Sequence, residues 1–84
     1  MKVSEYILRI NTLTISGEIV AAATLWYEGL DTLPVDDARR LHKDTYIMMK
    51  ESGVWQAKEV QELPRFKAAA DLFDEAAGTL QGLE

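Results

Sequence analysis

The side chains of this sequence that could do nucleophilic or acid–base chemistry centre on one histidine. His42 is the only histidine, and catalysis by a nucleophile and a base would need it paired with a hydroxyl and oriented by an acid. The serine hydroxyls that could serve are those of Ser4, Ser16 and Ser52. His42 falls at the border of the apolar face of a predicted helix, where a partly exposed histidine is the simpler interpretation. We therefore expect no catalytic residue and no enzyme.

Two groups of carboxylates could offer oxygen ligands to a metal ion. They are Asp71, Asp74 and Glu75, which share one helical face, and Asp36, Asp37 and Asp44. Di-iron bundles need Glu-x-x-His pairs on two helices and EF-hands need their own spacing of acids, and the sequence has neither. The absence of cysteine excludes thiolate zinc sites. Solvated helix faces explain these carboxylates, so we expect no metal and no other cofactor.

Phosphate-binding patterns are also missing from the sequence. Neither G-x-G-x-x-G nor G-x-x-x-x-G-K occurs, and the glycines follow predicted helices instead. Arg39, Arg40 and Lys43 form one small basic patch that aspartates interrupt. The chain carries 9 basic and 14 acidic side chains, a formal charge of −5. Because affinity for a phosphate backbone depends on positive charge, we expect no direct binding of nucleic acid.

Length and composition limit the architecture that could position such residues. With 84 residues, of which 48% are hydrophobic, the chain is expected to form one small helical domain over residues 1–84. A domain this small buries little surface and has no disulfide to reinforce it, so association would help to stabilise it. The most apolar window, residues 19–27, is shorter than the ~20 residues that span a bilayer. We expect a cytoplasmic protein without a secretory signal and without a membrane partner.

Helices are predicted for the middle and the end of the chain. Residues 34–52 begin with Pro34 in the first turn and place apolar side chains at 3–4 spacing, on a face that includes Val35, Leu41 and Thr45. Gly53 follows this helix. A second helix begins at residue 64 and carries a stripe of alternating Phe and Ala. Residues 55–63 are long enough for about two turns, and the proline at 64 predicts a break at residue 63.

The first third of the chain allows two interpretations. Residues 7–15 are rich in β-branched side chains, and Ser16-Gly17 could turn a β-hairpin arm that packs on the helices. The second arm would be Ala-rich, however, and a lone hairpin is unstable. We therefore predict one long helix over residues 4–28, bent near Gly17 and ended by Gly29. The predicted fold is an all-α bundle of three to four helices with a long apolar N-terminal helix.

The predicted N-terminal helix implies an interface. A helix that is apolar nearly all round must be covered nearly all round, and about 25 residues would extend roughly 37 Å, beyond the width of a domain this size. The helix carries two apolar stripes, one through Tyr6, Ile10 and Leu13 and one through Leu8, Ile15 and Ile19. The other segments are too short to cover both, so we expect a homo-oligomer, with a dimer favoured. The alternative is the central helix of a monomeric bundle. The candidate interface residues are Tyr6, Ile10, Leu13, Ile15, Gly17, Ala21, Trp26, Tyr27 and Trp55.

Three classes of function agree with these observations. The first is a small acidic protein-binding module, such as an adaptor, an assembly subunit or an inhibitor that occupies a partner protein's surface. The second is an acidic mimic that occupies the groove of a nucleic-acid-binding protein. The third is a small oligomer with a ligand or catalytic site between chains, with Arg39, Arg40 or Lys43 at its rim. The first is preferred because the predicted N-terminal helix leaves apolar surface uncovered, and such surface marks interaction sites. This preference fails if a single chain encloses Tyr6, Ile15 and Trp26.

Overall fold

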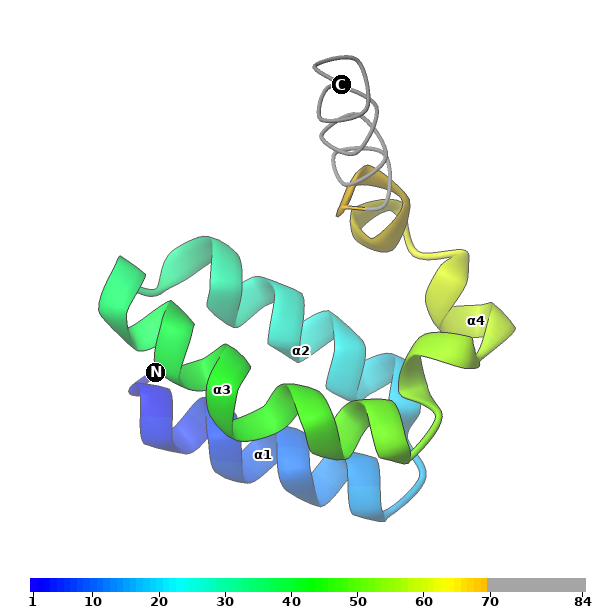
Figure 1. The fold of residues 1–84 in the computed structure, drawn as a ribbon, viewed down its shortest axis with the longest axis horizontal. Helices are drawn as coiled ribbons and strands as arrows, with labels where there is room; N and C mark the ends of the chain where they lie inside the picture. The colour runs from blue at the N-terminus through cyan, green and yellow to red at the C-terminus, as the bar shows by residue number, and fades with distance from the viewer. Residues whose placement is uncertain (70–84) are drawn as a thin grey trace, which may run out of the picture.

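The computed structural model describes residues 1–69, and all regular structure in this part is helical (Figure 1). The elements in chain order are α1 (Val3–Ile15), α2 (Ile19–Thr32), α3 (Val35–Glu51), a 3-10 turn η1 (Val54–Gln56) and the short α4 (Lys58–Gln61). Residues 64–69 are helical again. The predicted all-α class is confirmed, and the alternative of a β-hairpin arm is wrong because residues 1–69 contain no strand.

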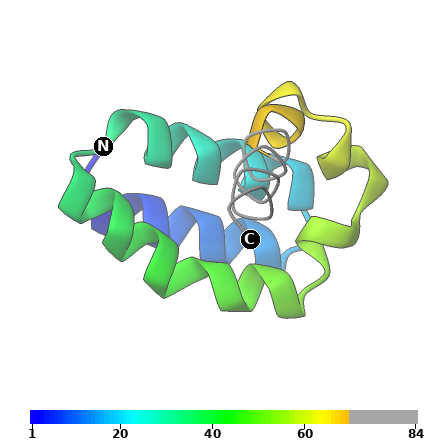
Figure 2. The ribbon, with the colours of Figure 1, turned by 45° about the horizontal axis from the view of Figure 1, so that its top comes forward.

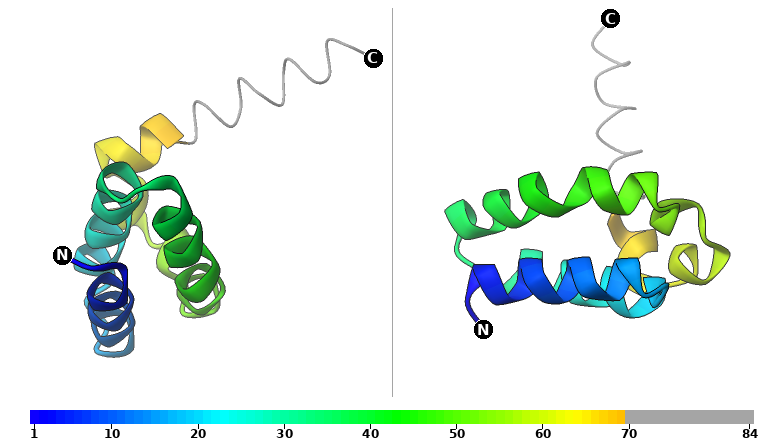
Figure 3. Two further views of the ribbon diagram at one scale, coloured as in Figure 1. Left: turned by 90° about the vertical axis from the view of Figure 1, so that its left-hand side faces the viewer. Right: turned by 90° about the horizontal axis from the view of Figure 1, so that it is seen from below.

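The three main helices run antiparallel to their neighbours along the chain, as Figure 1 shows. Seen end-on in the left part of Figure 3, α2 lies above α1 and α3 lies beside them, and α1 packs against both. The connections are short, which favours antiparallel neighbours. The core between the helices consists of Tyr6, Ile10, Ala22, Ala23, Trp26, Tyr27, Leu41 and Met49, extended by Val54 and Val60.

The prediction of one helix over residues 4–28 is wrong, because the chain reverses at residues 16–18. Gly17 has a φ of 86°, in the left-handed region that favours glycine. The Glu18 N–H donates to the Leu13 carbonyl at 2.9 Å and the Gly17 N–H to Thr14 at 3.2 Å, the two hydrogen bonds of a Schellman motif. The reversal lays α2 back on α1, so each helix covers apolar surface of the other.

A second correction concerns Gly29, which the sequence places at the end of a helix. In the structure α2 continues to Thr32 and Gly29 is buried inside it. A Cβ atom at this position would lie 2.5 Å from Leu41 Cδ2 and 3.2 Å from Tyr6 Cδ1. The glycine therefore allows the close packing of side chains from α1 and α3 against the backbone of α2.

Helix α3 confirms the predicted helix over residues 34–52 to within one residue at each end. It begins after Pro34 and ends before Ser52, and Gly53 follows with a φ of 79°. Leu41 and Thr45 are buried as expected, but Val35 is 68% exposed. Val35 lies six residues before Leu41, which places it about 120° around the helix from that buried position.

The chain after α3 folds back over the bundle. The predicted break at Leu63 is confirmed, because α4 ends at Gln61 and a helix resumes at residue 64. Figure 2 shows this resumed helix crossing over α2. The rest of the predicted C-terminal helix, including the acidic group at residues 71, 74 and 75, lies outside the described residues. No helix within residues 1–69 has both the length and the apolar character needed to cross a bilayer.

Candidate functional site

The structure divides the candidate interface residues by burial. Leu13 and Trp55 are half-buried, whereas Ile15, Gly17 and Ala21 are exposed. Those that belong to the hydrophobic core of the chain itself are Tyr6, Ile10, Trp26 and Tyr27. A partner could reach these four only if the core opened.

Only part of the apolar surface that the sequence predicts to be uncovered is exposed in the structure. Tyr6 and Trp26 are enclosed by their own chain, because the reversal at Gly17 lays α2 on α1, while α3 and η1 pack against Trp26. Ile15 differs, since 80% of its surface is exposed. The uncovered apolar surface of α1 is thus confined to the side of the helix that turns away from the core.

A stripe along α1, which we call the α1 outer face, consists of Ser4, Leu8, Thr12 and Ile15. Leu8 is 68% exposed, and it lies seven residues before Ile15, so both project from one side of the helix. The Thr12 hydroxyl donates to the Leu8 carbonyl at 2.9 Å, so part of its hydrogen-bonding need is met within the helix. The α1 outer face is uncharged, which reduces the cost of removing it from water.

A shallow groove of about 340 Å³ adjoins this face. It is lined by Leu8, Arg9, Thr12 and Leu13 of α1 and by Leu25 of α2. Leu8 and Thr12 belong to both the groove and the α1 outer face, so the two surfaces are continuous. Leu8 is not among the interface residues predicted from the sequence, although its heptad spacing to Ile15 already places the two side chains on one side of a helix.

Charged side chains follow one edge of the α1 outer face. Glu5 and Arg9 are four residues apart, which places them on the same side of α1, and both are exposed. The ion pairs within residues 1–69 are Arg40 with Asp44 at 3.6 Å and Arg65 with Asp31 at 2.8 Å. Neither Glu5 nor Arg9 thus has an ion-pair partner in the described part of the chain.

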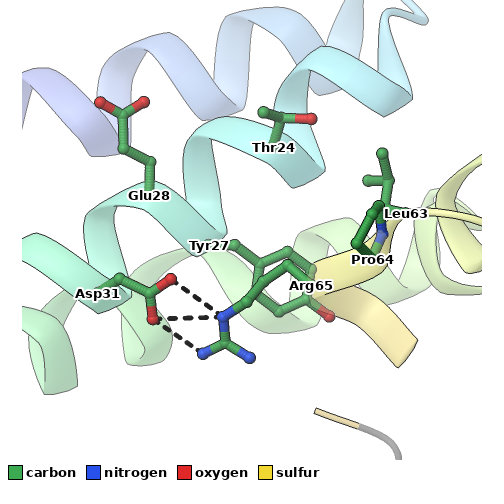
Figure 4. Close-up of a pocket in the computed structure, with 7 residues that line it drawn as sticks. All are labelled: Thr24, Tyr27, Glu28, Asp31, Leu63, Pro64 and Arg65. Carbon is green, nitrogen blue, oxygen red and sulfur yellow. Dashed lines mark hydrogen bonds and ion pairs between the residues drawn. The ribbon is translucent and has the colours of Figure 1, made fainter. Parts of the chain in front are cut away.

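A second groove, of about 350 Å³, lies between α2 and residues 63–65 (Figure 4). Arg65 donates to Asp31 from Nη2 at 2.8 Å and from Nε at 3.0 Å, and its guanidinium lies 5.1 Å from the centre of the Tyr27 ring. These hydrogen bonds hold the pKa of Asp31 below its ordinary value, whereas burial raises the pKa of Tyr27. The Glu28 carboxylate points away from the guanidinium in Figure 4. We call this arrangement the Arg65 clasp, since it ties the resumed helix to α2.

Aromatic side chains form a cluster between α2, α3 and η1. The Trp26 ring centre lies 4.9 Å from that of Trp55 and 5.1 Å from that of Tyr27. His42 is exposed and stacks on Tyr46 with the ring centres 4.7 Å apart, so its imidazole forms the outer edge of this cluster. A third groove beside it, of about 330 Å³, is lined by Leu30, Leu33, Val35, Ala38, Arg39 and His42.

The described residues bring few groups together for chemistry. Within residues 1–69, no three histidine or carboxylate side chains are placed where they could share a metal ion. Comparisons with known protein families, curated proteins and solved structures find no match to this chain.

Proposed function

We propose that this protein is a non-enzymatic, protein-binding module and that the α1 outer face is its binding surface. The proposal is supported by one observation above the others: Leu8 and Ile15 are 68% and 80% exposed at heptad spacing, on a helix whose opposite side is core. Contiguous exposed apolar surface is a mark of interaction sites on soluble proteins. The adjoining groove offers a recess for a side chain of the bound protein.

The two other classes of function receive less support. A nucleic-acid mimic needs a surface of unbalanced carboxylates, but the acids of α3 alternate with Arg39, Arg40 and Lys43, and Arg40 pairs with Asp44. An oligomer with a ligand or catalytic site between chains would need polar groups that converge at an interface. The α1 outer face offers only hydroxyls that already bond to backbone or lie in water.

The proposal is tested by covalent cross-linking and affinity capture in lysate of cells that express the protein. The bait would be the full chain, the double variant Leu8→Glu and Ile15→Glu, and the control Ile47→Glu. Ile47 is also exposed, but it lies on the outer side of α3. We expect the wild type and the Ile47 variant to form the same cross-linked products and the double variant to lose them.

Circular dichroism would establish that all three proteins have the same helix content. The proposal fails if the double variant keeps every cross-linked product, or if the wild type forms none.

A further inference from the structure

The partner of the α1 outer face can be narrowed to one kind of molecule. We infer that a second copy of this chain binds there, with the two α1 helices antiparallel about a two-fold axis that passes by Leu8. This inference rests on the proposed function, since it uses the same surface. It is carried by the spacing of the apolar side chains and by Glu5 and Arg9 along the edge, which have no ion-pair partner within residues 1–69.

The spacing of the exposed apolar side chains allows two symmetric registers. Residue numbers rise in opposite directions along two antiparallel helices. Within one register, the numbers of any two residues that lie opposite each other therefore add up to the same sum. In one register Leu8 lies opposite Ile15 of the second copy. In the other Leu8 lies opposite Leu8, and Ile15 lies just beyond the N-terminal end of α1 of the second copy, which the exposed Met1 precedes. Both registers bury Leu8, so apolar contact alone does not choose between them.

The charges at the edge choose the second register. A two-fold axis perpendicular to the helices places the same edge of both copies side by side. With Leu8 opposite Leu8, Glu5 lies within two residues of Arg9 of the second copy, an offset of about 3 Å along the axis. With Leu8 opposite Ile15, that offset grows to about 13 Å, so Glu5 and Arg9 of the second copy are too far apart to pair.

Symmetry doubles every contact of the chosen register. Glu5 of each copy pairs with Arg9 of the other, so two groups without an ion-pair partner in the described chain gain one in the dimer. These pairs offset part of the repulsion between two chains of formal charge −5. Arg9 also lines the groove beside Leu8, so side chains of the second copy that reach this edge adjoin the groove.

Sedimentation velocity over a concentration series of the purified full chain tests the inference. We expect the wild type to dimerise and Leu8→Glu to remain monomeric. Glu5→Arg and Arg9→Glu should each weaken dimerisation on the order of tenfold, because each reversal places like charges together twice. The double variant Glu5→Arg with Arg9→Glu should recover dimerisation to near the wild-type level. Glu59→Arg, an exposed reversal on α4, is the matched control and should change little.

The outcomes separate this inference from the proposed function. A wild type that stays monomeric at high micromolar concentration overturns the inference. If Leu8-dependent capture from lysate persists in that case, the proposed function stands with a different protein as the partner. A dimer that the single charge reversals leave unchanged, or that the double variant fails to restore, overturns the antiparallel register. If the wild type neither dimerises nor captures a protein from lysate, both proposals are overturned.

Discussion

The indole of Trp26 illustrates how single residues order the core. Its Nε1–H donates to the Thr45 hydroxyl at 2.9 Å, and that hydroxyl donates to the Leu41 carbonyl at 2.6 Å. The side chains of Trp26 and Thr45 are both buried, so neither the indole N–H nor the threonine hydroxyl can donate to water instead. A threonine at this position therefore does more than continue an apolar face, since it joins α2 to α3 through a directional contact.

The Thr45→Val substitution should destabilise the fold by about 1–3 kcal/mol, because the buried Trp26 N–H loses its acceptor while the side-chain volume is kept. Urea unfolding followed by circular dichroism measures this loss. Thr24→Val is the matched control, since Thr24 makes the same kind of bond to the carbonyl four residues back but is exposed. A Thr45 variant no less stable than the Thr24 variant would contradict this account.

Gly29→Ala should destabilise the protein by about 1 kcal/mol. Alanine favours a helix by about 1 kcal/mol, but the added methyl must displace buried Leu41 and Tyr6 side chains, and overpacking costs about 1–3 kcal/mol. Thermal unfolding measures the net effect. An increase in stability would mean that the helices tolerate a wider separation than the structure implies.

At the scale of elements, apolar periodicity predicts helices but not where the chain reverses. The apolar stripes run without interruption through residues 16–18, so their spacing is the same for a long helix and for two helices. The Schellman motif at Gly17 decides between these, because left-handed backbone there ends α1. At Gly29 the error has the opposite direction, because the sequence predicts a helix end there and α2 continues through it. Only its contacts with Leu41 and Tyr6 explain a glycine inside α2, and these join residues far apart in sequence.

The Arg65 clasp joins the resumed helix to α2 and should depend on pH. Arg65 lowers the pKa of Asp31 from its ordinary 3.8 in the folded state, so the ionised clasp stabilises the fold above that value. The contribution is lost as the pH falls through the lower folded-state pKa. Both side chains are about half exposed, so the effect should stay below about 1 kcal/mol.

Thermal unfolding midpoints of the wild type and Asp31→Asn, measured from pH 7 to pH 3, test this contribution. The wild type should be more stable at pH 6, and the difference should shrink as the pH falls below 3.8. Glu28→Gln is the matched control, because it removes a neighbouring carboxylate without touching the clasp. A difference that stays constant with pH, or that appears equally in the control, would contradict the clasp's role.

At the scale of the whole molecule, the sequence predicts the fold class better than the surface. The helix content, the break at Leu63 and the helix over residues 34–52 follow from local patterns, and the structure confirms them. The interface prediction depends on which stripes meet, which is a property of tertiary packing. Tyr6 and Trp26 were candidates only because a single long helix would have left them uncovered. Leu8 remains available because α2 and α3 cover the other side of α1.

The aromatic cluster gives the protein an internal optical reporter. Its tryptophans, Trp26 and Trp55, belong to different elements, yet their rings are only 4.9 Å apart. Indoles at such a separation couple electronically, so the near-ultraviolet circular dichroism of the pair depends on the mutual orientation of the two rings. The near-ultraviolet spectrum of the unlabelled protein should therefore change if η1 shifts against α2.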